Sequence, residues 1–377
     1  MDLLNQDWEV KSLDDLDPSG LQLVSDFFNE HFPGVFYPKC TPELFTWKLG
    51  STNPAGQGFL TVAMSNGLVV GTASGTRKIL IENNKILEAL EIGDTFTHPD
   101  FRKKGKCITP LSPNAEPDKY FTVSIFGRLV SETITRAQLN GVHLIYGTPN
   151  ENSKPPYLKR LKFNEIDNEN IYSKILLTPK FARLQRIRWV LHIFQFVCQS
   201  LTRGISYLKL GRNSLQEISS NQFLENYKDK IIFAEYEPNK MYLMNNYQVL
   251  YHRYILHPNH TYRFFQVNVK GASKGVLITT EILRSSGFSS FVVSDWLFSD
   301  EKVQKSLSLF ISKLRSHNLN SETISFWEFG RPGKLKQLLL GIITRKKVSV
   351  ICKDLRNSNL GKESEFGDFH IGWSDNG

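Results

Sequence analysis

A compact group of cations follows a strand-like segment close to residue 100. The stretch THPDFRKKGKC, residues 97–107, holds one glycine, Gly105, and the four cations Arg102, Lys103, Lys104 and Lys106. Cations beside a flexible glycine, next to the free N–H groups of a helix start, form a binding site for phosphate or pyrophosphate. A charge run is also commonly a solvated surface, so the residues alone leave both interpretations open. Nucleic-acid binding favours aromatic residues among the cations over a wider face, and this cluster is compact.

A helix start is expected downstream of this cluster. The segment SIFGRLVSETITRAQLNG, residues 124–141, places apolar residues on one helical face, with Ser124 at the N-cap and Gly141 as the stop signal. Gly127 falls in the first turn, where a glycine costs about 1 kcal/mol of helix propensity. Because a missing side chain lets a ligand approach the backbone, this glycine favours an anion site at the helix start.

The elements around the cluster follow from hydrophobic period and turn chemistry. Helical spacing indicates a helix over residues 20–33. Strand patterns cover residues 58–64, 67–75, 87–96 and 142–149. Asn66-Gly67 is a two-residue turn signal, so the first two strands should form an antiparallel hairpin.

Two segments resemble a known family of enzymes. The order strand, Arg102-x-x-Gly105-x-Cys107, helix, strand is similar to the acyl-CoA-binding core of the GCN5-related N-acetyltransferases, whose pyrophosphate loop reads Arg/Gln-x-x-Gly-x-Gly/Ala. Residues 141–163 resemble that family's next strand, an Asn-containing loop and a short helix with a tyrosine. Residues 107–123 depart from the pattern, because they stand between the glycine loop and the helix. Either the anion cradle is split around this insertion, or the helix start alone binds.

The resemblance implies acetyl-CoA, or another acyl-CoA, as co-substrate. It implies no metal, and no His, Cys or carboxylate cluster in the sequence has metal-ligand spacing. The residues that it implies for CoA binding are Thr95, Phe96, Thr97, Arg102, Lys103, Lys104, Gly105, Lys106, Ser124, Ile125, Phe126, Gly127, Arg128, Asn150 and Asn152.

The resemblance also implies three candidate catalytic residues. Glu91 or Asp94 would be the base for the acceptor amine, and Tyr157 would protonate the leaving thiolate. The period of a strand puts Glu88 and Asp94 on one face and Glu91 on the other. Either carboxylate is equally well explained as a strand-face group held by a cation, and Tyr157 as an aromatic that covers the cofactor slot.

The second half of the chain contains a segment similar to the first half. Residues 46–71 and 250–275 align without a gap, so that Gly71 and Gly275 coincide. This favours an internal duplication with a period far above solenoid length. The predicted fold class is α/β (α+β): two tandem acetyltransferase-like domains, each a mixed, mostly antiparallel twisted sheet flanked by helices. The predicted limits are an acyl-CoA-binding domain over 1–179, a basic amphipathic interdomain segment over 180–212 and a degenerate copy over 213–377.

The amino-acid composition limits the classes of binding partner but does not identify one. The 377 residues carry a net charge of +9, which favours anionic partners in general. We predict a cytoplasmic acyl-CoA-dependent N-acyltransferase acting on the amine of a small, anionic metabolite such as an amino sugar, with no nucleic acid. The alternatives are an aminoacyl-tRNA-dependent peptidyl transferase of related fold and a non-catalytic binding protein. The segment 180–212 would be an interdomain helix or a peripheral membrane contact.

Overall fold

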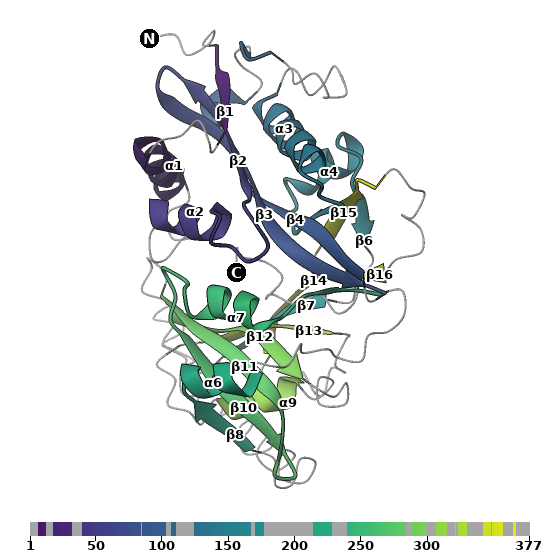
Figure 1. Ribbon diagram of the computed structural model, residues 1–377. Coiled ribbons are helices and arrows are strands. Elements are labelled where there is room, and N and C mark those ends of the chain that lie inside the picture. The colour runs from purple at the N-terminus through teal and green to yellow at the C-terminus, as the bar shows by residue number, and fades with distance from the viewer. Residues whose placement is uncertain are drawn as a thin grey trace.

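Two β-sheets, each with helices against both faces, make up the computed structural model (Figure 1). Both sheets are mixed and mostly antiparallel, which confirms the predicted fold class. No helix in the described part of the chain is long and apolar enough to cross a membrane. The described residues are 7–12, 18–31, 40–83, 85–102, 107–110, 124–166, 170–176, 214–227, 240–283, 289–298, 307–314, 321, 323–329, 342–347, 349–356 and 365–366. The basic segment 180–212 lies outside them, so its predicted membrane or interdomain role stays a prediction.

The first sheet forms the upper half of the view in Figure 1. Its main path runs in the order β1 (Glu9–Ser12), β2 (Phe59–Ser65), β3 (Leu68–Glu82), β4 (Lys85–Thr97), β5 (Leu144–Gly147), β15 (Val350–Asp354) and β6 (Asn164–Ile166). Off this path, β9 (Lys240–Leu243) pairs with the end of β3, and β16 (Glu365–Phe366) pairs with β9. One face packs on α1 (Pro18–His31) and α2 (Pro42–Leu49), and the other on α3 (Ile125–Leu139) and α4 (Lys154–Lys159).

The second sheet lies below the first and has the same kind of order. It runs β14 (Ile342–Lys347), β7 (Asn170–Leu176), β13 (Thr323–Phe329), β12 (Ser289–Phe298), β11 (Ala272–Leu283), β10 (Tyr262–Val269) and β8 (Ser214–Ile218). Helices α6 (Ser220–Tyr227) and α7 (Tyr247–Tyr254) cover one face, and α9 (Leu307–Leu314) covers the other. When both sheets are followed from β1 and from β8, the strands correspond position by position.

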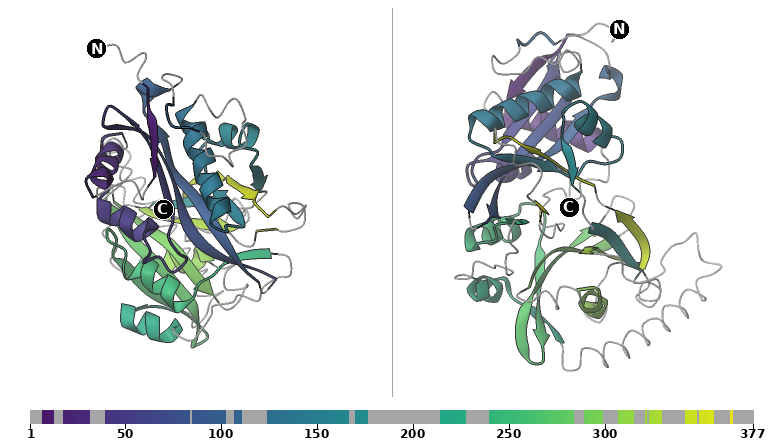
Figure 2. Two further views of the ribbon diagram at one scale, coloured as in Figure 1. Left: turned by 45° about the horizontal axis from the view of Figure 1, so that its top comes forward. Right: turned by 90° about the vertical axis from the view of Figure 1, so that its right-hand side faces the viewer.

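Each sheet contains at least one strand from the other half of the chain. β15 lies near the end of the chain, yet it pairs between β5 and β6 in the first sheet. β7 precedes residue 180, yet it pairs between β13 and β14 in the second sheet. Figure 2 shows the yellow β15 beside the blue elements and the teal β7 among the green ones. The range 1–179 therefore contains one strand of the second sheet, β7, and the range 213–377 contains three strands of the first sheet, β9, β15 and β16. As domain limits, both ranges stay a prediction.

One hydrophobic core extends across both sheets. It joins Leu80, Ala89 and Tyr146 of the first sheet to Phe265 and Phe291 of the second. Side chains in this cluster are almost fully excluded from water, so their burial stabilises both halves at once. The halves therefore share a core, in addition to exchanging strands.

The two aligned segments form matching elements. In each, a helix (α2 or α7) leads into an antiparallel hairpin (β2–β3 or β10–β11). The first hairpin has a register shift at Ala63, opposite Gly71, and the second has one at Val267, opposite Gly275. A Cβ atom on Gly71 would meet Ile125 Cγ2 at 2.3 Å. The two hairpins therefore match in the position of their bulges as well as in the order of their elements. A similar amino-acid composition alone would not produce this match.

Several local predictions are confirmed. Asn66 and Gly67 have φ of 49° and 77°, as a tight hairpin turn with two positive φ angles requires. Ser124 caps α3, because its Oγ accepts a hydrogen bond from the Gly127 N–H at 3.0 Å. Gly141 follows that helix with φ of 73°.

The exchanged strand β15 gives a stability prediction. Ile351 is fully buried against α3 and α4, so Ile351→Ala should lower the free energy of unfolding by about 2–5 kcal/mol. Amides of β5 should then exchange hydrogen faster, because β15 is the antiparallel partner of β5. Chemical denaturation and hydrogen exchange measure both effects.

The control is Leu283→Ala in β11, a leucine that is 42% exposed. Its effect should stay within about 0.5 kcal/mol. Faster exchange confined to the second sheet in Ile351→Ala would contradict the pairing of β15 with β5.

Candidate functional site

Strands β4 and β5 run parallel and then part. They pair only from Ala89 to Glu91 on β4 and from Leu144 to Tyr146 on β5. β4 continues to Thr97, where it pairs with β3 alone among the described residues. Beyond Glu91, β4 has no ladder pairing with β5 in the described part of the chain, so a ligand could approach β4 from that side.

A β-bulge at Asp94 turns the end of β4. Thr72 pairs with Phe96 and Ser74 with Gly93, so Asp94 and Thr95 together stand opposite Ala73. Asp94 has φ of 47°, a left-handed conformation that Asp adopts more readily than most residues. The extra residue reverses the side-chain alternation beyond it.

This bulge corrects one sequence prediction. Asp94 was expected to share a face with Glu88 and to oppose Glu91. The structure instead directs both Glu91 and Asp94 toward the α2 side, whereas Glu88 pairs with Arg77 beside the C-terminal end of α3. The sequence pattern could not show this, because a single inserted residue leaves no signature in hydrophobic period.

Asp94 is held by several hydrogen bonds. Its Oδ2 accepts from Lys48 Nζ at 2.8 Å and from Ser74 Oγ at 2.6 Å. Its backbone carbonyl accepts from Thr72 Oγ1 at 2.7 Å. The side chains of Lys48 and Asp94 are each 6% exposed. These bonds fix the bulge against α2, which favours a structural role for Asp94.

Glu91 is buried beside a different lysine. Lys78 Nζ lies 3.4 Å from Glu91 Oε2, and the two side chains are 7% and 3% exposed. This separation is longer than a charge-assisted hydrogen bond of about 2.8 Å. Glu91 is thus neutralised by Lys78 across a longer separation than the one between Lys48 and Asp94.

Tyr157 meets β4 where the strands part. Its hydroxyl lies 3.0 Å from Thr95 Oγ1, and Thr95 Oγ1 in turn donates to the Gly93 carbonyl at 3.1 Å. Since a hydroxyl has one hydrogen, Tyr157 is the donor in the first bond. The ring packs against Phe126 and Phe163, and burial raises the pKa of Tyr157 to about 12. Tyr157 is therefore a neutral donor at physiological pH.

The first turn of α3 lies next to Tyr157. Gly127 donates its N–H to the cap of Ser124, and Arg128 donates its N–H to the Ser124 carbonyl. The N–H groups of Ile125 and Phe126 have no acceptor within the described residues. An anion at this helix start would therefore meet two backbone donors and the positive end of the helix dipole.

The side chain of Arg128 points elsewhere. It is 3% exposed, and its Nη2 donates to the Pro110 carbonyl. Residues 107–110 run beside Trp8 at the outer edge of the first sheet, where the Ile108 N–H donates to the Trp8 carbonyl. Arg128 thus ties the start of the insertion to α3, and its predicted contact with CoA has no support from its position.

The cationic loop is described only at its beginning. Arg102 is exposed, donates from Nε to the Thr97 carbonyl at 3.4 Å, and lies 5.9 Å from the centroid of the Phe96 ring. Thr97 Oγ1 is buried without a hydrogen-bond partner in the described structure. Lys103, Lys104, Gly105 and Lys106 lie outside the described residues. Their role in binding pyrophosphate stays a prediction.

Asn150 organises the loop between β5 and α4. Its Oδ1 accepts from the N–H groups of Asn152 and Ser153 at 3.0 Å and 2.9 Å, and its carbonyl accepts from Lys154. This is local turn chemistry, and it directs the helix that carries Tyr157. Asn152 takes part through its backbone, and contacts of either residue with pantetheine stay predictions.

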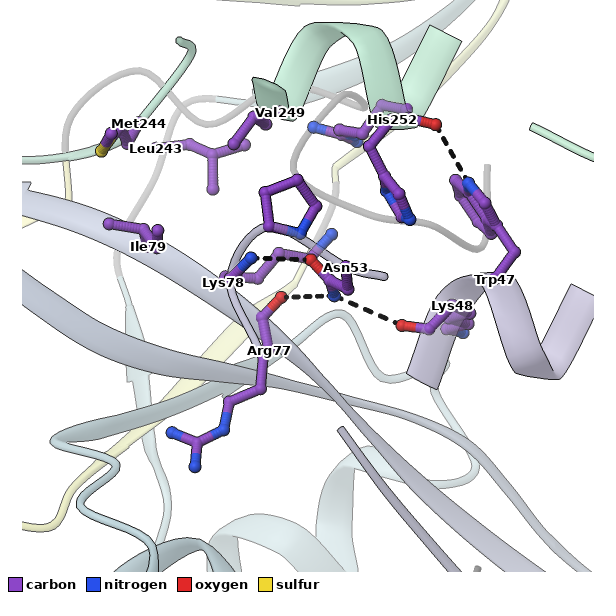
Figure 3. Close-up of a pocket in the computed structure, with 13 residues that line it drawn as sticks. Trp47, Lys48, Asn53, Arg77, Lys78, Ile79, Leu243, Met244, Val249 and His252 are labelled. Atoms are coloured by element: carbon purple, nitrogen blue, oxygen red, sulfur yellow. Dashed lines mark hydrogen bonds between the residues drawn. The ribbon is translucent and has the colours of Figure 1, made fainter. Parts of the chain in front are cut away.

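The sequence did not reveal the two lysines that pair with Asp94 and Glu91, or the pocket beside them. Lys48 and Lys78 line a pocket of about 30 Å³ between α2, β3 and α7, together with Trp47, His252 and Arg253 (Figure 3). The Trp47 ring stacks on His252 at 5.0 Å and donates from Nε1 to the His252 carbonyl at 3.0 Å. Lys78 was overlooked because the predicted strand ended at residue 75, whereas β3 continues to Glu82. A lysine within a buried strand was the signal available.

The part of the chain that the structure describes contains no candidate metal site. No group of three or more His, Cys, Asp or Glu side chains in the described residues is arranged to hold a metal ion.

Comparison with known proteins identifies the fold. No protein-family model matches the sequence, and no curated protein matches it. Among solved structures, a probable N-acyltransferase from Enterococcus faecalis V583 has a TM-score of 0.55 at 12% identity, covering 92% of this chain and 72% of that one. Saccharomyces cerevisiae N-myristoyltransferase with bound myristoyl-CoA has a TM-score of 0.53 at 11% identity, covering 92% and 82%. A GCN5-related N-acetyltransferase from Anabaena variabilis gives 0.50 at 11%, covering 92% and 73%.

The buried pair Lys48–Asp94 gives a second stability prediction. Lys48→Met or Asp94→Asn alone should lower the free energy of unfolding by about 3–5 kcal/mol, because each leaves a buried partner uncompensated. The double variant should lose clearly less than the two single losses combined. Denaturation of the four proteins measures the coupling.

The matched control is the exposed pair Arg263–Glu217, whose side chains are 35% and 44% exposed. Its coupling should not exceed about 1 kcal/mol. Equal coupling in the two pairs would mean that Asp94 does not fix the bulge.

Proposed function

We propose that this protein is an acyl-CoA-dependent N-acyltransferase. The observation that carries the proposal is the parting of β4 and β5 next to the start of α3, with Tyr157 hydrogen-bonded to Thr95 at that point. Open peptide groups suit the amides of a pantetheine arm, and the helix start suits a pyrophosphate. The likeness of the fold to N-acetyltransferases and N-myristoyltransferase supports the same reaction class.

The reaction is direct transfer. A neutral amine attacks the thioester carbonyl carbon, a C–N bond forms, and the C–S bond breaks to release the CoA thiolate. The amine must lose a proton, and developing charge on sulfur must be stabilised. Glu91 and Tyr157 are the groups that we assign to these two tasks.

Glu91 is the better candidate for the base. Asp94 accepts short hydrogen bonds from Lys48 and Ser74, whereas Lys78 Nζ lies 3.4 Å from Glu91 Oε2, so the ion pair of Glu91 is the longer of the two. Glu91 faces α2, whereas Thr95 meets Tyr157 of α4, and the two residues lie at most about 13 Å apart along β4. The amine proton would therefore reach Glu91 through water.

Tyr157 would act on the leaving sulfur. Its pKa of about 12 lies well above that of an ordinary thiol, about 8.5, so its proton is not transferred completely to a thiolate. We therefore assign it a hydrogen bond to the developing thiolate, with solvent supplying the proton. To make this bond, the hydroxyl must turn from Thr95 to the sulfur.

The acyl donor and the acceptor are less closely defined. Acetyl-CoA is the donor expected from the sequence, and myristoyl-CoA binds to the N-myristoyltransferase of similar fold, so donors of both chain lengths need testing. The acceptor is an amine, and an anionic metabolite suits a chain with a net charge of +9. We interpret the two halves as tandem copies of one unit, of which the first binds CoA.

Charge reversal at the end of β4 tests cofactor binding. Arg102→Glu should raise the Kd of CoA at least about 10-fold, because it replaces a favourable phosphate contact by repulsion. Titration calorimetry with CoA measures the change. The control is Lys85→Glu, the same reversal at the exposed opposite end of β4. Equal weakening in both variants would indicate a general charge effect and remove the pyrophosphate assignment from Arg102.

Removal of one hydroxyl tests the chemical step. Tyr157→Phe should keep CoA affinity within about 3-fold and lower kcat about 10–100-fold, because it deletes only a hydrogen bond that strengthens in the transition state. With a pKa of about 12, the Tyr157 phenol stays protonated below about pH 10, so the ratio of rates should be constant from pH 6 to about 10. The rate of acyl transfer, followed as the release of the CoA thiol at each pH, measures this ratio. Unchanged kcat would exclude Tyr157 from the reaction.

A further inference from the structure

A histidine holds the turn between α7 and β10. α7 ends at Tyr254 and β10 begins at Tyr262. Between them, the Nδ1 atom of His257 accepts hydrogen bonds from the backbone N–H groups of Asn259 at 3.1 Å and His260 at 3.2 Å. A neutral imidazole that accepts on Nδ1 carries its one hydrogen on Nε2, and an imidazolium has no acceptor at all. The turn therefore requires the uncharged form of His257.

The same histidine contacts the first half of the chain. The centroid of its ring lies 4.3 Å from that of Trp47 on α2. Trp47 also stacks on the ring of His252 and donates from Nε1 to the His252 carbonyl (Figure 3). The next residue of α2, Lys48, donates to Asp94 at the bulge of β4. His257 thus belongs to the contact that holds α2 against the second half, and α2 in turn holds the bulge.

A turn of the same kind in the first half differs in one charge. His98 is also followed by a proline, and its Nδ1 accepts from the N–H group of Asp100 at 3.2 Å. Asp100 Oδ2 lies 3.9 Å from that Nδ1, so a carboxylate stands beside the ring when His98 is protonated. At the corresponding position after His257, the chain has Asn259, which brings no charge. Protonation of the second turn is therefore not compensated from this position.

Two uncharged rings lie next to His257. The ring centroid of His260 is 4.7 Å away, and burial lowers the pKa of His260, which favours its neutral form. The ring of Tyr262 on β10 is 5.8 Å away, and a phenol is ordinarily uncharged below about pH 9. On α7, Arg253 lies over the ring of Tyr254. A proton on His257 would thus add a charge beside two neutral rings.

Other charged side chains on the surrounding elements take part in interactions of their own. On α2, β3 and β10 they form the pairs Lys48–Asp94, Lys78–Glu91, Arg77–Glu88 and Arg263–Glu217. Glu43 lies in the first turn of α2 and bonds to Thr41, and Asp295 of β12 accepts from Tyr254. Lysine, arginine and carboxylate side chains ordinarily keep their charge between about pH 5.5 and 7.5, so histidines are the groups that titrate around this turn.

We propose that His257 is a pH-sensitive contact between the two halves: protonation of its Nδ1 opens the turn and loosens Trp47, so that mild acid removes support from the bulge at Asp94. Solvent supplies the proton, and the N–H groups of Asn259 and His260 lose their acceptor. The effect on catalysis rests on the proposed N-acyltransferase function, whereas the effect on the turn does not.

The direction of the effect follows from proton linkage. The closed turn takes only the neutral imidazole, whereas the unfolded chain binds a proton with the ordinary histidine pKa of about 6.5. The contribution of His257 to stability is therefore complete above about pH 7 and is lost as the pH falls below about 6.5. For one group that is protonated only after unfolding, the equilibrium constant of unfolding rises about 10-fold between pH 7.5 and 5.5.

An asparagine at position 257 separates the hydrogen bonds from the charge. Asn150 Oδ1 accepts from the N–H groups two and three residues further on, the same pattern as His257 Nδ1. His257→Asn should therefore keep the turn with an acceptor that does not titrate. In chemical denaturation, the equilibrium constant of unfolding should increase about 10-fold more in the unmodified protein than in His257→Asn when the pH is lowered from 7.5 to 5.5. Because all other histidines titrate in both proteins, equal increases would overturn the proposal.

A second variant changes the charge beside the histidine instead of the histidine. Asn259→Asp places a carboxylate where Asp100 stands beside His98, and it should reduce the response to acid because it compensates the protonated ring. A response to acid as large as that of the unmodified protein would contradict the role of charge at this turn. If His257→Asn does not fold, Asn259→Asp still decides the question.

The indole N–H of Trp47 reports the contact between the halves directly. Its NMR resonance, identified by its absence from Trp47→Phe, should shift between pH 7.5 and 5.5 in the unmodified protein and stay in place in His257→Asn. A resonance that is insensitive to pH in both proteins would show that the turn does not act on α2.

Kinetics connect the contact to the reaction. With any acyl-CoA and amine that react, the two proteins should have equal kcat/KM at pH 7.5, and the unmodified protein should be up to about 10-fold slower than His257→Asn at pH 5.5. Parallel pH profiles would exclude regulation of catalysis by His257. If no amine is acylated, the proposed function fails, and the denaturation and NMR results still test the turn.

Discussion

The candidate site depends on one additional residue in β4. Asp94 and Thr95 stand opposite a single residue of β3, and the strand turns away from β5 at this bulge. The same residue changes which side chains face α2, so that Glu91 and Asp94 come to lie on one face of the sheet. The left-handed backbone of Asp94 is held by Lys48, Ser74 and Thr72. Local backbone strain of this kind is commonly found at functional sites, where surrounding contacts maintain it.

The second half contains a comparable bulge. β12 also has a register shift, next to Asp295, and this aspartate accepts a hydrogen bond from Tyr254 of α7. In both halves, therefore, a buried aspartate at a bulge is bonded to the helix that precedes the first hairpin. A role common to both halves is a role in the fold, which explains why Asp94 is a weaker candidate for the base than Glu91. The two carboxylates, three residues apart in the chain, thus have different surroundings.

The turns, helix caps and approximate strands could be predicted from the sequence, whereas contacts between residues far apart in the chain could not. The turn at Asn66-Gly67, the cap at Ser124, the stop at Gly141 and the approximate strands followed from short-range chemistry. The fold class followed from the resemblance to a known family, carried by the order strand, Arg102-x-x-Gly105-x-Cys107, helix, strand. The bulge at Asp94 and the lysine partners were missed, because ion pairs such as Lys48–Asp94 join residues far apart in the chain. The extension of β3 was missed for the same reason, since Lys78 is acceptable in a buried strand only beside Glu91.

The exchange of β7 and β15 has a consequence for biosynthesis. A nascent chain emerges from the ribosome N-terminus first, and domains often fold as they emerge. Here β5 pairs with β15, so the sheet that carries Glu91 reaches its final pairing only after residues 350–354 have been made. Until then, β5 has an open edge of the kind that invites pairing with other chains. A chain that stopped before β15 would leave this edge of β5 unpaired.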